Sequence, residues 1–312
     1  MREIDILCVG ETLIDFIGQQ QEVAIHETRD YHRYLGGSPT NVAMNMARLG
    51  LNVRLASTIG KDGFGTYILN KLSENKVSAD LVRQDEFAPT SVIFVSQTTG
   101  TPDFIPYRKA DIQITPEQIP DSVLEKTAIY HTTAFALSKK PARTTILEKA
   151  AAAKAAGCTL SIDVNYAPRI WPNREKAKQV IATYCAHDPL VKVSEDDMER
   201  LFGTPKTHQE IFDYFHEELG VTTVCLTLGS AGVTLSRKHK PIISLPAKRV
   251  EHILDATGAG DAFWSGFLFA HIKGFEEERC LKIALSLAAI KLQNVGRLPQ
   301  NVDLLTQLLA IT

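Results

Sequence analysis

The chain has 312 residues, and its balance of 44% hydrophobic and 22% charged residues is that of a globular protein with a substantial core. A net charge of −2 and the absence of a dense Lys/Arg block argue against a role in binding nucleic acid or a membrane surface. Acidic residues close to Met1, and the lack of any run near the ~20 apolar residues of a membrane span, predict a soluble, cytoplasmic protein.

Strand-like and helix-like segments alternate along most of the chain. In chain order, the predicted strands cover residues 4–9, 53–59, 129–132, 159–164, 190–193 and 223–227. The predicted helices cover residues 40–49, 64–75, 141–156, 174–185, 195–202 and 209–219, and three more begin near residues 262, 277 and 301. This alternation predicts an α/β fold with a doubly wound, mostly parallel sheet flanked by helices. Because no internal repeat or linker is found, residues 1–312 are expected to form a single domain.

Two segments break the alternation. Residues 13–35 look like β-structure with a polar loop, and residues 89–108 look like a hairpin with a Thr-Thr-Gly-Thr turn. Neither segment has a crossover helix of its own. Together they are expected to form a small antiparallel sheet that projects from the main domain as a lid or a dimer surface.

The cysteines and histidines show no pattern of a disulfide framework or a metal site. The five cysteines are scattered and include no CxxC pair, and several lie in apolar, strand-like runs. The nine histidines lack metal-ligand spacing. The sequence therefore predicts free, buried thiols in a reducing compartment and no transition-metal chemistry.

The motif DATGAGD at residues 255–261 is the most informative segment of the chain. β-rich stretches at residues 242–245 and 250–254 precede it, and an apolar helix follows it. Its three small residues leave the backbone bare where a helix N-terminus exposes unpaired N–H groups, which predicts an anion site. Asp261 would repel a bound phosphate, but it suits a base that deprotonates a nucleophile attacking phosphorus. The alternative is a plain N-cap Asp after a glycine turn.

A second glycine motif, GGSPTN at residues 36–41, precedes another predicted helix. Gly36 and Gly37 let a ligand approach the backbone closely, and the amide of Asn41 can bond to hydroxyl groups. Taken alone, this motif fits a turn and a helix cap equally well.

Together the two motifs resemble the ribokinase-like (PfkB) family of carbohydrate kinases, and its fructokinases most of all, over nearly the whole chain. Two further segments resemble family motifs, GETLID at residues 10–15 and GKDGFG at residues 60–65. No Walker-type GxxxxGK[ST] motif is present, which excludes the P-loop kinases as the source of the ATP chemistry.

The resemblance implies a kinase that uses ATP to phosphorylate a primary hydroxyl of a sugar. Asp261 would deprotonate the hydroxyl, and the backbone N–H groups of Gly258, Ala259 and Gly260 would stabilise the transferred phosphoryl group. Mg²⁺ would accompany ATP, mainly through phosphates and water. The resemblance also implies a potassium ion beside the anion site and a homodimer formed through the lid.

The resemblance assigns further residues to the cations and the nucleotide. The potassium ligands would be Asp255 and Thr257, with backbone from residues 295–296. Asp197 ends the segment 194–197, which orders magnesium-bound water in the family but has Glu at this position there. The predicted nucleotide contacts are Ser194, Thr227, Gly229, Gly232, Gly258 and Ser286.

The predicted sugar contacts come from the lid and the main domain: Asp15, Gly36, Gly37, Asn41, Tyr107, Arg108, Asn165 and Arg169. The pair Tyr107-Arg108 resembles both fructokinases and 2-keto-3-deoxygluconate kinases. Ala167 stands where these kinases usually have an Arg suited to a sugar-acid carboxylate, and Arg169 follows two residues later.

This departure favours D-fructose as the substrate and fructose 6-phosphate as the product. One alternative is a kinase for 2-keto-3-deoxygluconate or a related keto-sugar acid, and another is a kinase of an inositol pathway. An alternative of another class is a non-catalytic regulator of the same fold that binds sugar and nucleotide.

Overall fold

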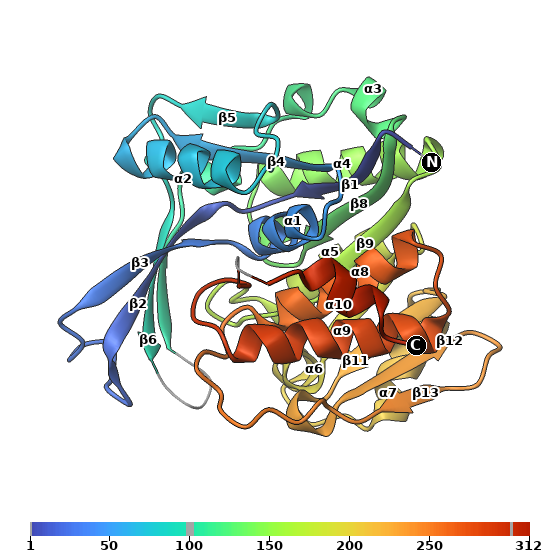
Figure 1. Cartoon of the computed structure of the whole chain (residues 1–312). Helices are drawn as coiled ribbons and strands as arrows, with labels where there is room; N and C mark the ends of the chain where they lie inside the picture. Colours follow the sequence, from blue (N-terminus) through green and yellow to red (C-terminus); the bar gives the residue numbers. More distant parts are fainter. Residues whose placement is uncertain (1, 98–102, 300–301) are drawn as a thin grey trace.

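The structure is a computed structural model that describes residues 2–97, 103–299 and 302–312. Its centre is a nine-stranded sheet in the order β13-β12-β11-β10-β9-β8-β1-β4-β5 (Figure 1). The seven strands from β11 to β5 pair in parallel, whereas β12 and β13 pair antiparallel at one edge. The strands are β1 (Ile4–Val9), β4 (Val53–Gly60), β5 (Val82–Asp85), β8 (Thr127–Thr133), β9 (Thr159–Asp163), β10 (Leu190–Ser194), β11 (Thr223–Thr227), β12 (Val233–Arg237) and β13 (Ile243–Leu245).

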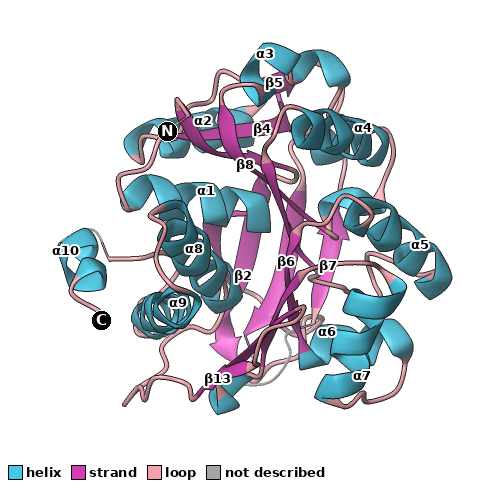
Figure 2. Cartoon of the chain, turned by 90° about the vertical axis from the view of Figure 1, so that its right-hand side faces the viewer, coloured by secondary structure: helices cyan, strands magenta, loops and turns pink. Residues whose placement is uncertain are grey.

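Helices cover both faces of this sheet (Figure 2). One face carries α1 (Ser38–Arg48), α2 (Gly63–Glu74), α8 (Ala259–Ile272), α9 (Glu277–Leu292) and α10 (Leu304–Leu309). The other face carries α3 (Asp121–Leu124), α4 (Ala142–Ala155), α5 (Arg174–Cys185), α6 (Glu195–Phe202) and α7 (His208–Asp213). The predicted doubly wound α/β fold is therefore confirmed, while the extent of a single domain stays a prediction.

Strand β1 shows how the sequence produces this two-sided core. Ile6, Leu7, Cys8 and Val9 are all fully buried. Ile6 and Cys8 pack on the side of α1 and α8, and Leu7 and Val9 pack on the opposite side. A continuous apolar run of this kind is typical of a parallel strand covered on both faces. All five cysteines of the chain are likewise buried and free, including Cys8, Cys158 and Cys225, the three that lie in or beside apolar strand-like runs and were predicted to be buried.

A second sheet of four strands projects from the main sheet (Figure 1). Its order is β3 (Tyr31–Gly36), β2 (Leu13–Gln21), β6 (Val92–Gln97) and β7 (Phe104–Tyr107). The predicted antiparallel arrangement is correct for the two outer pairs, but the central pair of β2 with β6 is parallel. β2 continues β1 and β6 follows β5, and both parent strands run in the same direction. The predicted turn at residues 98–101 lies outside the described residues.

Other predicted elements differ in detail. Residues 250–254 form no strand, because the sheet ends at β13 and the side chains of Ile253 and Leu254 are exposed. The helix predicted at 209–219 ends as α7 and continues as one π-helical turn over Tyr214–Glu218. Within the described part of the chain, no helix combines the length and the apolar character that crossing a membrane requires.

Candidate active site

The carboxyl ends of the parallel strands bring together polar residues from distant parts of the chain. Glu11 follows β1, Asp163 ends β9, and Ser194 ends β10. Helices α1 and α8 begin beside these residues, since the N–H of Ser38 donates to Glu11 and Gly260 lies against a side chain of β10. Ligands of open α/β sheets bind outside this edge. The candidate active site is therefore at this edge.

Asp261 lies in the first turn of α8 and is held by two side chains of α1. The hydroxyl of Ser38 donates to its Oδ1 at 2.6 Å, and Nδ2 of Asn41 donates to its Oδ2 at 2.8 Å. Asn41 and Asp261 are 220 residues apart in the sequence. The structure thus joins the two glycine motifs into one site around a single carboxylate.

Gly258 is the N-cap of α8 and has φ 76° and ψ 6°, a left-handed conformation that favours glycine. The N–H of Ala259 donates to the carbonyl of Ala256 at 3.2 Å. Among the described residues, no acceptor is found for the N–H groups of Gly258 and Gly260. Of the three N–H groups predicted to bind an anion, two are therefore available, at the positive end of the helix dipole.

Lys192 of β10 places a buried ammonium group behind the start of α8. Its Nζ is 2.7 and 3.0 Å from the two carboxylate oxygens of Asp163. A Cβ atom built on Gly260 would lie only 3.0 Å from the same Nζ. Burial alone would lower the pKa of Lys192, but Asp163, Asp197 and Asp261 raise it. A positive charge therefore lies directly against the anion site.

Burial raises the pKa values of the acids in the site. Burial first, and repulsion from Asp163 second, raise the pKa of Asp261 to about 6. Burial and repulsion from Asp261 raise the pKa of Asp15 to about 7, and burial raises the pKa of Glu11 to about 8. Asp261 is thus ionised at neutral pH and remains basic enough to accept a proton.

A model of the pfkB family carbohydrate kinases matches residues 3–301. The chain belongs to this family. It is 33% identical to the ATP-dependent 6-phosphofructokinase of Thermoanaerobacterium thermosaccharolyticum over 97% of this chain and 92% of that relative. The structure of Halothermothrix orenii fructokinase is 34% identical, with a TM-score of 0.81 over 91% of this chain and 98% of that one. A sugar kinase from Pyrococcus horikoshii in complex with ATP is 26% identical, with a TM-score of 0.84 over 97% of this chain and 99% of that one.

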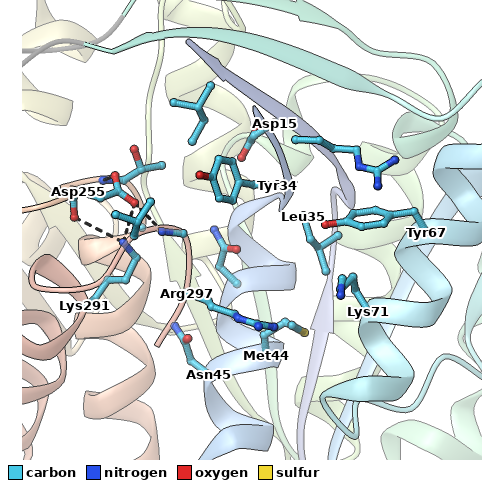
Figure 3. Close-up of a pocket in the computed structure, with 17 residues that line it drawn as sticks. Asp15, Tyr34, Leu35, Met44, Asn45, Tyr67, Lys71, Asp255, Lys291 and Arg297 are labelled. Carbon is cyan, nitrogen blue, oxygen red and sulfur yellow. Dashed lines mark hydrogen bonds and ion pairs between the residues drawn. The ribbon is translucent and has the colours of Figure 1, made fainter. Parts of the chain in front are cut away.

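The site of this carbohydrate kinase contains a cavity of about 320 Å³ next to Asp261, which is in the size range of small-molecule sites (Figure 3). Of the predicted sugar contacts, Asp15 and Asn41 line it. Gly36 lies directly against the first of these residues, because a Cβ atom on Gly36 would overlap the Asp15 carboxylate. A Cβ atom on Gly37 would overlap the carbonyl of Glu11.

Neither of the two predicted sugar contacts at the end of the lid hairpin, Tyr107 and Arg108, lines the Asp15 cavity. Strand pairing puts Tyr107 on the face of the small sheet opposite Asp15, so within one chain it does not face the Asp15 cavity. Arg108 is buried and forms an ion pair with Asp111 at 2.6 Å. Its Nη1 also donates to the hydroxyl of Ser138, so the guanidinium anchors the base of the lid.

The two predicted sugar contacts after β9 already have protein partners. Asn165 Oδ1 accepts from the N–H of Phe135 at 3.1 Å. Arg169 is half exposed and pairs with Asp103 at 2.7 Å, so it connects the main sheet region to the lid hairpin.

The predicted nucleotide contacts follow β10 and β11 and reach α9. Ser194 caps α6, and its N–H and hydroxyl both donate to Oδ2 of Asp197, so the cap already uses one of the two carboxylate oxygens of Asp197. Thr227 ends β11, and its hydroxyl donates to the carbonyl of Val193 at 3.4 Å. The glycines that follow have positive φ angles, 56° at Gly229 and 113° at Gly232.

The last two predicted groups are at α9 and at the loop before α8. Ser286 of α9 is buried beside Lys248. Asp255 accepts from the N–H of Thr257 at 2.9 Å and forms a 3.0 Å ion pair with Lys291. Among the described residues, no group of three or more His, Cys, Asp or Glu side chains is arranged to hold a metal ion.

Glu11, Lys192 and Lys291 are among the site residues that were not predicted as such. Each had a signal in the sequence, since each is a charged residue within or directly after an apolar element. A charged residue at such a position is almost never buried without a partner. The residue that binds each of these charged side chains cannot be identified from the sequence, because it lies on another strand or loop.

Proposed function

We propose that this kinase transfers the γ-phosphoryl group of ATP to a primary hydroxyl of D-fructose. The products are fructose 6-phosphate and ADP. One observation carries the proposal: an ionised carboxylate, Asp261, is held rigidly at the start of α8 beside free N–H groups and above a cavity of sugar size. A carboxylate beside an anion site suits a base and not a phosphate ligand.

In the proposed mechanism, Asp261 accepts the proton of the hydroxyl while the hydroxyl oxygen attacks the γ-phosphorus. The bond from the γ-phosphorus to the bridging oxygen of ADP breaks, and ADP leaves. The N–H groups of Gly258 and Gly260 and the ammonium of Lys192 stabilise the negative charge of the transferred group. Bound Mg²⁺ supplies further neutralisation of the phosphates. Asp15 and Asn41 orient the sugar through its hydroxyls.

A second acceptor, fructose 6-phosphate, is favoured by the charge of the cavity. Arg33, Lys71 and Arg297 line it together with Asp15 (Figure 3). Guanidinium and ammonium groups suit a sugar phosphate. The relative named 6-phosphofructokinase supports the same candidate. A keto-sugar acid has less support, since Arg169 already pairs with Asp103.

The test is steady-state ADP release with fructose, fructose 6-phosphate, 2-keto-3-deoxygluconate, ribose and adenosine. Fructose should give the highest kcat/KM, and Asp261→Asn should lower kcat by about 10²–10⁴-fold. The double variant Arg33→Ala/Arg297→Ala should lower the turnover of fructose much less than that of fructose 6-phosphate. A preference of about tenfold or more for fructose 6-phosphate that this double variant abolishes would establish the second acceptor instead. Folded protein with no turnover of any acceptor would support the non-catalytic regulator.

A further inference from the structure

Lys291 lies in the last turn of α9 with only 3% of its surface exposed. Its Nζ is 3.0 Å from Oδ2 of Asp255 and 3.0 Å from the carbonyl of Asn294, and it is 3.5 Å from the carbonyl of Asp255 (Figure 3). Burying an ammonium group is costly unless oxygen atoms surround it. Here three oxygens from two loops surround it.

These contacts tie together the two loops behind the anion site. Asp255 accepts a hydrogen bond from the N–H of Gly296 at 2.9 Å and another from the N–H of Thr257. The Cε atom of Lys291 would lie 3.7 Å from a Cβ atom built on Gly258. The ammonium therefore fixes the turn that aims the N–H groups of α8, and it adds positive charge behind them.

The potassium ion implied by the family resemblance does not fit this arrangement. Its implied ligands are Asp255 and Thr257, with backbone from residues 295–296. The Lys291 ammonium already pairs with the Asp255 carboxylate and contacts the carbonyls of Asp255 and Asn294 in the same two loops, so it occupies the place of the ion beside Asp255. A bare potassium ion and an ammonium group carry the same charge and are similar in size. The two therefore exclude each other, and no step of the mechanism involves the ion.

We infer that Lys291 is a built-in replacement for a monovalent cation, so that this kinase needs no potassium ion. The covalent ammonium holds the 255–258 turn in its anion-binding shape at any salt composition. Removing the ammonium leaves a small negative cavity of one carboxylate and two carbonyls, which accepts K⁺ or NH₄⁺. The catalytic part of this inference rests on the proposed phosphoryl transfer.

The experiment compares wild type, Lys291→Ala and Lys291→Met in tetramethylammonium buffer, with and without added KCl or NH₄Cl. Wild-type kcat/KM should not change with either salt. Lys291→Ala should lose about 100-fold in kcat/KM without them and regain most of it with them. Lys291→Met should stay low in every buffer, since its side chain fills the cavity without a charge.

A binding measurement separates this inference from the proposed function. KCl should raise the Tm of Lys291→Ala in a saturable manner, because an ion that binds only the folded state stabilises it by mass action. It should not do so for wild type or for Lys282→Ala, a control that removes an exposed lysine from the same helix. Saturable activation or stabilisation of wild type by K⁺ would overturn the inference. Folded Lys291→Ala that neither binds nor responds to K⁺ and NH₄⁺ would overturn it as well, whatever sugar the kinase uses.

Discussion

Asp261 must be ionised to accept the proton of a sugar hydroxyl. Burial and Asp163 raise its pKa to about 6, so the fraction of active enzyme should fall as the pH drops through this value. We expect kcat/KM to decrease about tenfold per pH unit below pH 6 and to level off above it. A pH–rate profile measured at constant ionic strength checks this. A rate that stays constant down to pH 4.5 would contradict the assignment of Asp261 as the base.

The same pKa shift predicts an effect on stability. The folded-state pKa of Asp261 is above its ordinary value of 3.8, so the folded protein binds the proton more tightly than the unfolded chain does. The ionised carboxylate therefore destabilises the fold above pH 6, and this cost disappears below about pH 4. Asp261→Asn should raise the free energy of unfolding at pH 8 by up to about 3 kcal/mol, and by less at pH 5. Urea unfolding at both pH values measures the difference, and a variant less stable than wild type at pH 8 would count against it.

The acidic residues of the site were easier to predict from the sequence than its lysines. Asp15 and Asp261 follow recognisable motifs, so their positions could be named before the fold was known. The roles of Lys192 and Lys291 could not be predicted in this way. The role of a lysine within an apolar strand or helix depends on the carboxylate with which it pairs. Asp163 and Asp255 are 29 and 36 residues away from these lysines in the chain.

At the scale of elements, the ion pair of Lys192 with Asp163 joins β10 to β9 beneath the anion site. Removing one charge of a buried pair leaves the other uncompensated. Lys192→Met should therefore lower the free energy of unfolding by about 3–5 kcal/mol, and Lys192→Met/Asp163→Asn should recover most of this loss. Both variants should show kcat lowered by about 10–100-fold, since neither has a charge beside Gly260.

Denaturant unfolding and ADP release, measured on the same preparations, separate the two effects. Lys178→Met serves as the control, because Lys178 pairs with Glu175 on the partly exposed surface of α5. Its stability should change by less than about 0.5 kcal/mol. If the double variant recovered activity together with stability, Lys192 would have only a structural role.

The two glycine turns that precede α1 and α8 should tolerate alanine differently. Gly37 has φ 102°, and a Cβ atom there would overlap the carbonyl of Glu11. Gly258 has φ 76°, but its nearest neighbour would be 3.7 Å away. Gly258→Ala should therefore cost about 1–2 kcal/mol from backbone strain alone, and Gly37→Ala should cost clearly more. Thermal unfolding of the two variants compares them, and equal Tm values would contradict the steric argument.

Some helices and strands could be predicted from the sequence more accurately than others. The apolar runs of the central strands gave accurate bounds, and α5, α6 and β11 begin and end where the sequence predicts. The stretch 250–254 has the composition of a strand but finds no neighbouring strand to pair with. The direction of β2 relative to β6 depends on the order of strands in the main sheet, which local sequence does not contain.

At the scale of the whole molecule, the small sheet covers the cavity with one face and presents the other away from it. The second face carries Phe16 and Phe94, whose rings stack at 5.0 Å, and the exposed side chains of Ile105 and Tyr107. Helix α2 covers part of this face, where Phe64 contacts Phe16.

The resemblance to dimeric kinases and this partly covered aromatic face lead to the same prediction, a homodimer formed face to face through the small sheets. Pairing through the edge of β7 is disfavoured, because Pro106 lacks an N–H group.

Ile105 and Tyr107 are 36% and 58% exposed, so Ile105→Lys/Tyr107→Lys should place two charges in the interface and leave the core of each chain intact. Sedimentation at micromolar concentration should show a dimer for wild type and a monomer for this variant. Leu309→Lys, which changes an exposed apolar residue of α10, should remain a dimer. A wild-type monomer, or a double variant that still dimerises, would rule out this interface.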